Sequence, residues 1–160
     1  MKTLRVLSPS VVLVFVVSIV AGMGAQAPKG MEGAWKLNVT KSKFSPGPAP
    51  KSMTLVYSAV GTTGIKIVAD MVPSTGAAQH WEMTAHYDGK DHPVTGNPNA
   101  DTISLRRIDD LTGESTFKKG GKVTATNRRT LSADGKTLTI TSSGTTEDGK
   151  PRKDVQVFER

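Results

Sequence analysis

Turn signals at regular intervals constrain the fold of this chain more than any other feature. The tripeptide Asp-Gly-Lys occurs three times, starting at Asp88, Asp134 and Asp148, and each copy lies between runs of alternating apolar and polar residues. Asp-Gly favours a hairpin because both residues tolerate positive φ. No window of about a dozen residues keeps the 3.6-residue period of an amphipathic helix. The sequence therefore predicts an all-β domain with almost no helix.

The expected fold class is an antiparallel up-and-down β-barrel of about 8 to 10 strands. A sandwich also fits a meander of short strands, but pairing the first strand with the last removes both exposed edges and favours the barrel. The Pro-rich stretch 42–51 can neither join a ladder nor form a helix, so an extended loop or a lid is expected there. Strands are expected over residues 32–39, 52–60, 65–72, 80–87, 102–108, 115–118, 122–131, 137–143 and 153–159.

The pairing register of two strand pairs can be predicted, with an alternative for each. At the barrel closure one register places Trp35 opposite Arg160, with the guanidinium over the indole. A shift of one residue, which the alternation of the last strand by itself prefers, would instead turn the valines of that strand inward. At residues 119–121 a three-residue loop that pairs Phe117 with Val123 is preferred to a two-residue loop.

Residues 1–27 have the layout of a secretory signal peptide. A basic start precedes an apolar run over 11–21, and Ala25-Gln26-Ala27 has the form of a signal-peptidase site. The run is shorter than the roughly 20 residues that span a bilayer, so removal is expected, with no stable membrane insertion afterwards. Pro28 would hinder a cut after Ala27, and a cut after Gly24 or Ala25 stays open. A periplasmic or secreted location follows from this expectation.

The composition fits a single domain over residues 28–160, preceded by the signal peptide at 1–27. That length buries a moderate core and leaves no room for a second domain. There is no cysteine, so stability must come from core packing and sheet closure. The formal net charge is +7, but the basic residues are interleaved with acids, which is typical of a solvated surface. No nucleic-acid partner is expected, and the oligomeric state is not predicted.

No catalytic, cofactor or metal signature is found in the sequence. His80, Glu82 and His86 share one face of their predicted strand, but the opposite face is apolar and must be the buried one. His80 and His86 also lie about 20 Å apart along a strand, too far to share an ion. The chain has no Cys, no G-x-S-x-G and no H-E-x-x-H. An enzyme is therefore not the expected function.

Both ends of the predicted domain resemble those of the calycin barrels, the lipocalins and fatty-acid-binding proteins. The resemblance lies in Gly33-Ala34-Trp35-Lys36-Leu37 and in the final run 155–160, while residues 87–98 resemble small exported bacterial lipocalin-like proteins of unknown function. It implies a barrel that takes a small hydrophobic or amphipathic ligand. It also favours the closure register with Trp35 opposite Arg160, because in these families a Trp on the first strand lies near a basic residue on the last. The fatty-acid-binding proteins hold the ligand carboxylate with an Arg-x-Tyr pair, and the aligned positions here are Gln156 and Phe158.

Arg107 and Arg129 are the sharpest candidates for ligand contacts. Each ends a strand face that begins apolar, and in a meander both reach one end of the barrel, about 10 Å apart. A carboxylate or phosphate could bridge them. The competing interpretation is that both are solvated at the rim or pair with a loop acid such as Asp109. The other candidate contacts are Tyr57, Met83, Leu105, Phe117, Gln156 and Phe158.

The function expected from the sequence is binding of a small lipidic or anionic molecule by an exported barrel. The alternative is a structural or protein-interaction module whose barrel interior is filled by its own side chains, and an enzyme ranks third. The volume of the interior cavity distinguishes the first two.

Overall fold

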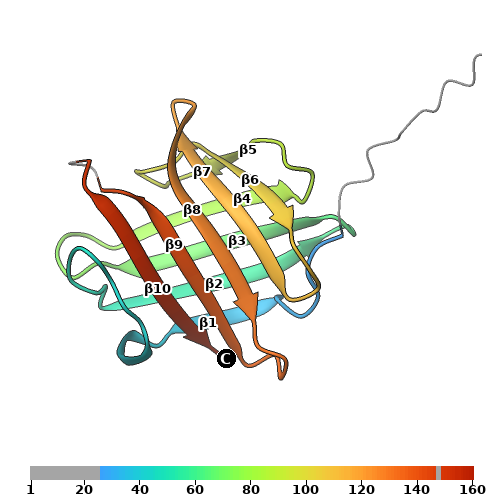
Figure 1. Cartoon of the computed structure of the whole chain (residues 1–160), viewed down its shortest axis with the longest axis horizontal. Helices are drawn as coiled ribbons and strands as arrows, with labels where there is room; N and C mark the ends of the chain where they lie inside the picture. Colours follow the sequence, from blue (N-terminus) through green and yellow to red (C-terminus); the bar gives the residue numbers. More distant parts are fainter. Residues whose placement is uncertain (1–25, 147–148) are drawn as a thin grey trace, which may run out of the picture.

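The computed structural model describes residues 26–146 and 149–160. Within these ranges ten antiparallel strands close into a barrel in the order β1-β10-β9-β8-β7-β6-β5-β4-β3-β2 (Figure 1). The predicted up-and-down barrel is confirmed. The predicted signal peptide, residues 1–27, lies outside the described residues except for Gln26 and Ala27. No helix in the described part of the chain is long and apolar enough to cross a membrane. The strands are β1 (Gly33–Leu37), β2 (Ser52–Val60), β3 (Gly64–Val72), β4 (Gln79–His86), β5 (His92–Thr95), β6 (Thr102–Arg107), β7 (Thr112–Lys119), β8 (Lys122–Leu131), β9 (Thr137–Thr145) and β10 (Pro151–Glu159).

β5 was not predicted as a strand. It has only four residues, includes Pro93, and pairs with β4 and β6 over two residue pairs each. So short a run shows too little alternation to be recognised, and proline cannot donate to a ladder. β1 is shorter than predicted, because the chain leaves it at Asn38, whose side chain accepts from the Lys41 N–H and caps the 3-10 turn η1 (Val39–Lys41).

The turn between β7 and β8 has two residues, so the predicted three-residue loop is wrong. Gly120 and Gly121 have φ values of 54° and 77°, which suits the positive φ that a two-residue hairpin turn requires at both positions. The ladder then shifts between Phe117 and Lys118, and Phe117 faces Ala125. This bulge absorbs one extra residue of β8 and keeps the apolar side chain of Phe117 inside the barrel.

The barrel closes between β1 and β10 in the predicted register. Leu37 lies opposite Phe158, which brings Arg160 level with Trp35. The guanidinium carbon of Arg160 is 4.5 Å from the centroid of the Trp35 ring, a cation–π contact that contributes about 0.5 to 2 kcal/mol. Its nitrogens also donate to the backbone carbonyls of residues 30 and 32, at 3.3 and 2.8 Å. The shifted alternative is excluded.

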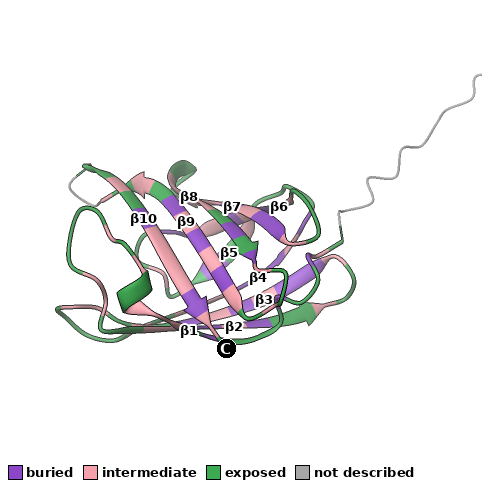
Figure 2. Cartoon of the chain, turned by 60° about the horizontal axis from the view of Figure 1, so that its bottom comes forward, coloured by how far each residue is buried: buried purple, intermediate pink, exposed green. Residues whose placement is uncertain are grey.

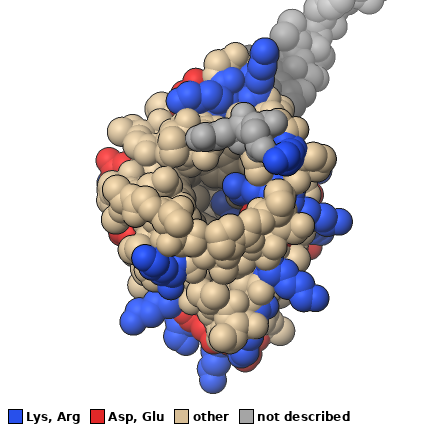
Figure 3. All heavy atoms as spheres, turned by 90° about the vertical axis from the view of Figure 1, so that its left-hand side faces the viewer, with Lys and Arg blue, Asp and Glu red and all other residues tan. Residues whose placement is uncertain are grey.

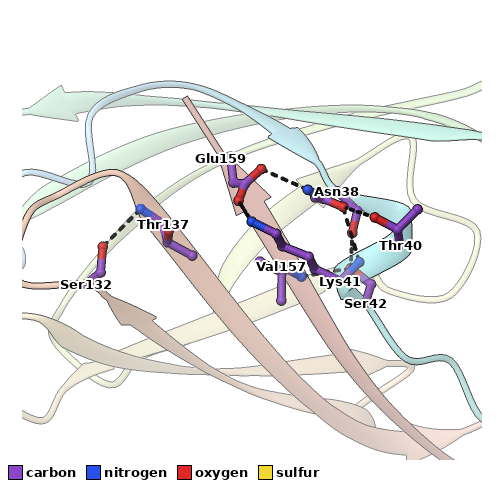
Figure 4. A network of polar contacts seen from close by, with 8 residues as sticks. All are labelled: Asn38, Thr40, Lys41, Ser42, Ser132, Thr137, Val157 and Glu159. Carbon is purple, nitrogen blue, oxygen red and sulfur yellow. Dashed lines mark hydrogen bonds and ion pairs between the residues drawn. The ribbon is translucent and has the colours of Figure 1, made fainter.

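A polar network next to this ladder joins η1 to β10 (Figure 4). The Asn38 amide donates to one Glu159 oxygen at 2.8 Å, and the Lys41 ammonium pairs with the other at 2.6 Å. The Ser42 hydroxyl accepts the Val157 backbone N–H at 2.9 Å. The segment that follows β1 therefore stays beside β10 and covers its edge. Hydrogen bonds from Lys41 and Asn38 hold the pKa of Glu159 below its ordinary value.

Buried and more exposed residues alternate along the strands, as Figure 2 shows. The largest fully buried side chains at the ends of β1, β9 and β10, including Trp35, Leu138 and Phe158, meet at one end of the barrel. Met31 precedes β1, is fully buried in this cluster, and accepts a 2.8 Å hydrogen bond from the Trp35 indole through its carbonyl. We call this the closed end. The opposite end, which carries the β1–β2, β3–β4, β5–β6, β7–β8 and β9–β10 loops, is the open end.

Candidate functional site

A cavity of about 530 Å³ enters the barrel from the open end. Figure 3 looks onto this end and shows the hollow, with basic side chains around it. The volume falls in the range of about 300 to 1,000 Å³ that is typical of small-molecule sites. The interior is thus not filled by the protein's own side chains, which is the feature that separates the two leading functions expected from the sequence.

The cavity has an apolar wall and a polar wall. Inward positions alternate along each strand, so the composition of each wall follows from the parity of its residues. The apolar wall, from β2 to β4, presents Met53, Leu55, Tyr57, Ile67, Met71, Trp81 and Met83. The polar wall, from β8 to β10, presents Asn127, Arg129, Ser142, Asp154 and Gln156, with Ala125 and Ile140 between them. Such an interior suits an amphipathic molecule.

Arg129 is the most unusual residue of the polar wall. It lines the cavity but is only 3% exposed, and no carboxylate in the described part of the chain forms an ion pair with it. Its Nε and Nη2 atoms are buried without a hydrogen-bond partner. Arg129 lies opposite Gly113 across the ladder. A Cβ atom added at Gly113 would lie 3.6 Å from Arg129 Nη2 and 3.4 Å from the Tyr87 ring. The missing side chain at Gly113 leaves the room that the guanidinium and this phenol share.

Two tyrosines surround this cation. Burial raises the pKa of the Tyr57 phenol, while the charge of Arg129 and hydrogen bonding to its guanidinium oppose that rise. Burial disfavours the charge on Arg129, but the phenols of Tyr87 and Tyr57 more than offset this effect, and the pKa of Arg129 lies above its ordinary value. The inner end of the cavity therefore carries a permanent positive charge, and a guanidinium suits a carboxylate or phosphate ligand.

Asp154 fastens the Pro-rich loop over the open end. Its carboxylate is buried, pairs with Arg152 Nε at 3.1 Å, and accepts the Ser45 backbone N–H at 3.1 Å. The Ser45 carbonyl accepts the Lys153 N–H at 2.7 Å. The predicted extended loop thus reaches β10 and supplies Phe44, Pro46, Gly47, Pro48 and Pro50 to the cavity lining. Because Asp154 already has these partners, it does not neutralise Arg129.

The structure brings five of the eight predicted ligand contacts together. Leu105 and Phe158 are instead fully buried in the hydrophobic core and do not line the cavity. Both have the inward parity that suggested them, but neighbouring side chains cover them. The five that line the cavity are Tyr57, Met83, Phe117, Arg129 and Gln156.

Arg107 does not join Arg129 in one site. The two residues reach the same end of the barrel and lie level with each other across Gly113, as predicted. Arg107, however, is the last residue of β6, so its side chain reaches the β6–β7 turn, where Nε donates to the Asp109 carbonyl and Nη2 pairs with the Asp110 carboxylate. The competing interpretation, pairing with a loop acid, describes Arg107, although the carboxylate belongs to Asp110. A joint arginine site for an anion is therefore not formed.

Several lining residues were missed by the sequence analysis. Counting back in twos from Phe158 reaches Gln156 and then Asp154, so parity alone could have placed Asp154 inside the barrel. The same count from Arg129 reaches Asn127. The lining residues of the Pro-rich loop gave no comparable signal, because a loop without regular structure has no inward parity.

The histidine-bearing face of β4 points away from the cavity. Met83 and Ala85 are buried and His80 is exposed, which confirms the predicted orientation. His86 and His92 have ring centroids 5.6 Å apart, and His92 Nε2 lies 2.9 Å from the Asp88 carboxylate. No group of three or more His, Cys, Asp or Glu within residues 26–146 and 149–160 is arranged to hold a metal ion.

No family model matches this sequence, and no curated protein matches it. Among solved structures, wild-type fluorescent protein UnaG is similar with a TM-score of 0.54 and 15% identity, covering 84% of this chain and 99% of that one. A point mutant of UnaG gives 0.52 and 16%, with 82% and 96% covered. A redesigned β-barrel, mFAP1, bound to DFHBI, gives 0.47 and 17%, with 85% and 100% covered. The likeness to UnaG shows the fold alone.

Proposed function

We propose that this protein binds a small amphipathic anion inside the barrel, with the anionic group paired to Arg129. The observation that carries the proposal is a buried guanidinium that lines a cavity of about 530 Å³ and has no acidic partner among the described residues. A buried charge without a partner is costly, and an anionic ligand would supply the missing partner. The apolar wall would receive the body of the ligand.

Two features favour binding over the other functions considered. A structural module with a filled barrel would not need an open interior of this size. Catalysis would need a free acid, base or nucleophile near the ligand, whereas the carboxylate of the polar wall, Asp154, is occupied by Arg152 and Ser45. We therefore propose that the protein holds its ligand without converting it.

The test compares two probes of the same chain length and opposite charge, dodecanoate and dodecylammonium, by isothermal titration calorimetry. Wild-type protein should bind dodecanoate and discriminate against dodecylammonium. Arg129→Gln should weaken dodecanoate binding about 10- to 100-fold, because a hydrogen-bonded pair with a charged group contributes about 1.5 to 3 kcal/mol.

The matched control is Arg128→Gln, the same change one residue earlier on β8. Arg128 lies on the outer face, where its side chain is 52% exposed and pairs with Glu114. Dodecanoate binding should be unchanged in this variant. If Arg129→Gln binds dodecanoate as tightly as wild type does, or if wild type prefers the cation, the proposed site is wrong.

Export is also part of the proposal. Met31 and Trp35 pack into the closed end downstream of every candidate cleavage site, so a mature protein that begins between Ala25 and Pro28 would keep its core intact. Expression of the full chain in a Gram-negative host, followed by fractionation and N-terminal sequencing, tests this. Protein recovered from the cytoplasm with Met1 in place would contradict export.

A further inference from the structure

A row of polar side chains crosses the inner wall of the barrel, one level closer to the open end than Arg129. The register places Asn127 of β8 opposite Ser142 of β9, and Ser142 opposite Asp154 of β10. Ser115 of β7 lies opposite Asn127 on the other side. Four successive strands thus carry a polar residue at one level. Because neighbouring strands lie about 4.8 Å apart, the row spans roughly 14 Å.

Three members of this row are buried, Asn127 is partly exposed, and two of the four carry a polar atom without a partner. Ser115, Ser142 and Asp154 are 1%, 2% and 4% exposed. The Ser115 hydroxyl and the Asn127 side-chain oxygen are buried atoms without a hydrogen-bond partner. Asn127, Ser142 and Asp154 line the cavity. Buried polar groups in proteins are nearly always paired, so the unpaired Asn127 oxygen on the cavity wall points to a partner that comes from outside the chain.

A straight-chain alkyl acid would not supply that partner. Its carboxylate could reach Arg129 and its chain could cover the apolar wall, but its methylene groups would lie against Asn127 and Ser142 and leave them unpaired. A site built to hydrogen-bond a ligand group rejects an analogue that lacks the group, because its own buried polar atoms then stay unsatisfied.

We propose that the ligand is an anion with one hydrogen-bonding edge, read by the row Asn127–Ser142–Asp154, and one apolar edge that lies on β2 to β4. This inference rests on the proposed function and names its ligand class. Hydroxyl, carbonyl or N–H groups of the ligand pair with the amide of Asn127 and the hydroxyl of Ser142. Asp154 keeps lone pairs free to accept a further donor beside Ser45 and Arg152. These groups begin roughly 7 Å from the anionic group, the distance of two residues along β8.

The test compares two acids of the same chain length and head group, octadecanoate and 6,7-dihydroxyoctadecanoate, by isothermal titration calorimetry on wild-type protein. The hydroxylated acid should bind at least about tenfold more tightly, because only this acid can form hydrogen bonds with the buried polar groups. Equal affinities, or tighter binding of octadecanoate, would overturn the inference.

Two double variants assign the preference to the row. Asn127→Leu with Ser142→Ala removes both polar groups and should abolish the preference for the hydroxylated acid. The control, Thr126→Val with Ser143→Ala, changes the neighbouring pair on the exposed outer face. This variant should keep the preference for the hydroxylated acid. If the first double variant does not fold by circular dichroism, Ser142→Ala alone removes one oxygen and should reduce the preference severalfold. A preference that persists in the row variants would refute the inference.

Failure of this inference can be told apart from failure of the proposed function. If wild type binds both acids equally and Arg129→Gln weakens both, the anion site stands and the row does not select the ligand. If wild type binds neither acid, the proposed function itself is wrong and the row loses its role with it.

Discussion

Replacing Arg129 with methionine should stabilise the ligand-free protein. The side chains are similar in length, so methionine can occupy the same channel while removing the charge. In the present structure the guanidinium is 3% exposed, has no acidic partner among the described residues, and leaves two nitrogens unpaired. Folding must therefore desolvate a cation that gains the contacts of the two tyrosines but no acidic partner among the described residues.

The magnitude follows from these contacts. Each unpaired buried N–H costs about 1 to 3 kcal/mol, and the replacement removes two of them. The Tyr57 phenol loses its neighbouring charge and hydrogen-bond partner, which costs about 1 to 3 kcal/mol in the other direction. We expect a net gain of about 1 to 3 kcal/mol, in line with the roughly 1 to 4 kcal/mol gained when buried charges are replaced by apolar residues.

Urea unfolding of protein stripped of bound lipid is the assay, because a retained anion would stabilise wild type alone by mass action. Arg128→Met, on the exposed face of the same strand, should change stability by less than about 0.5 kcal/mol. Added dodecanoate should raise the melting temperature of wild type and of Arg128→Met but not that of Arg129→Met. A loss of about 2 kcal/mol or more in ligand-free Arg129→Met would show that the tyrosines and Arg129 form a structural unit, and would refute the reasoning.

Three further predictions concern the framework of the barrel. Phe158→Ala should destabilise the protein by about 3 to 5 kcal/mol in urea unfolding, since the ring is fully buried at the closed end; a loss below about 1 kcal/mol would contradict that placement of the core. Gly144→Ala should cost about 1 to 3 kcal/mol, because the new Cβ would lie 2.3 Å from the Thr124 carbonyl oxygen and the backbone must shift; an unchanged melting temperature would show that β8 and β9 adjust freely. Because the pKa of Glu159 is lowered in the folded state, its contribution to stability is present above the unfolded-state pKa and is lost as the pH falls through the folded-state pKa. The melting temperatures of wild type and Glu159→Gln should therefore differ at pH 7 and converge below about pH 4. A difference that stays constant with pH would exclude this linkage.

Much of the fold could be predicted from the sequence because its determinants are local. Asp-Gly turns and alternating residues define hairpins, and hairpins in sequence define a meander. The closure register was predictable from the resemblance of the two ends to the calycin barrels, because the alternation of β10 alone prefers the shifted register. β5 was not predicted because four residues around Pro93 show too little alternation. The bulge beside Phe117 was not predicted because the length of a turn does not determine the pairing of the residues beyond it.

For the candidate site, the sequence predicts which side chains point into the barrel but not which groups they contact. Alternation places Arg129 and Gln156 inside the barrel, as observed. Whether an inward arginine faces a cavity or a neighbouring acid depends on its distance from the strand end. Arg107 ends β6 and reaches Asp110 of the following turn, whereas Arg129 lies two residues before the end of β8 and reaches no acid in the described part of the chain. Sequence spacing alone does not supply that difference, because it requires the turn conformation.

The distribution of the core explains how this barrel can tolerate a buried charge without an acidic partner and two unpaired oxygens of the polar row. Its three largest fully buried side chains, Met31, Trp35 and Phe158, lie at the closed end, where the first and last strands meet. Burial there stabilises the closure and does not depend on how the wall toward the open end is composed. The polar row can therefore lower the stability of ligand-free protein without opening the barrel, and a ligand that pairs with it would recover that stability on binding. The same polar groups that select the ligand would then couple its binding to the stability of the fold.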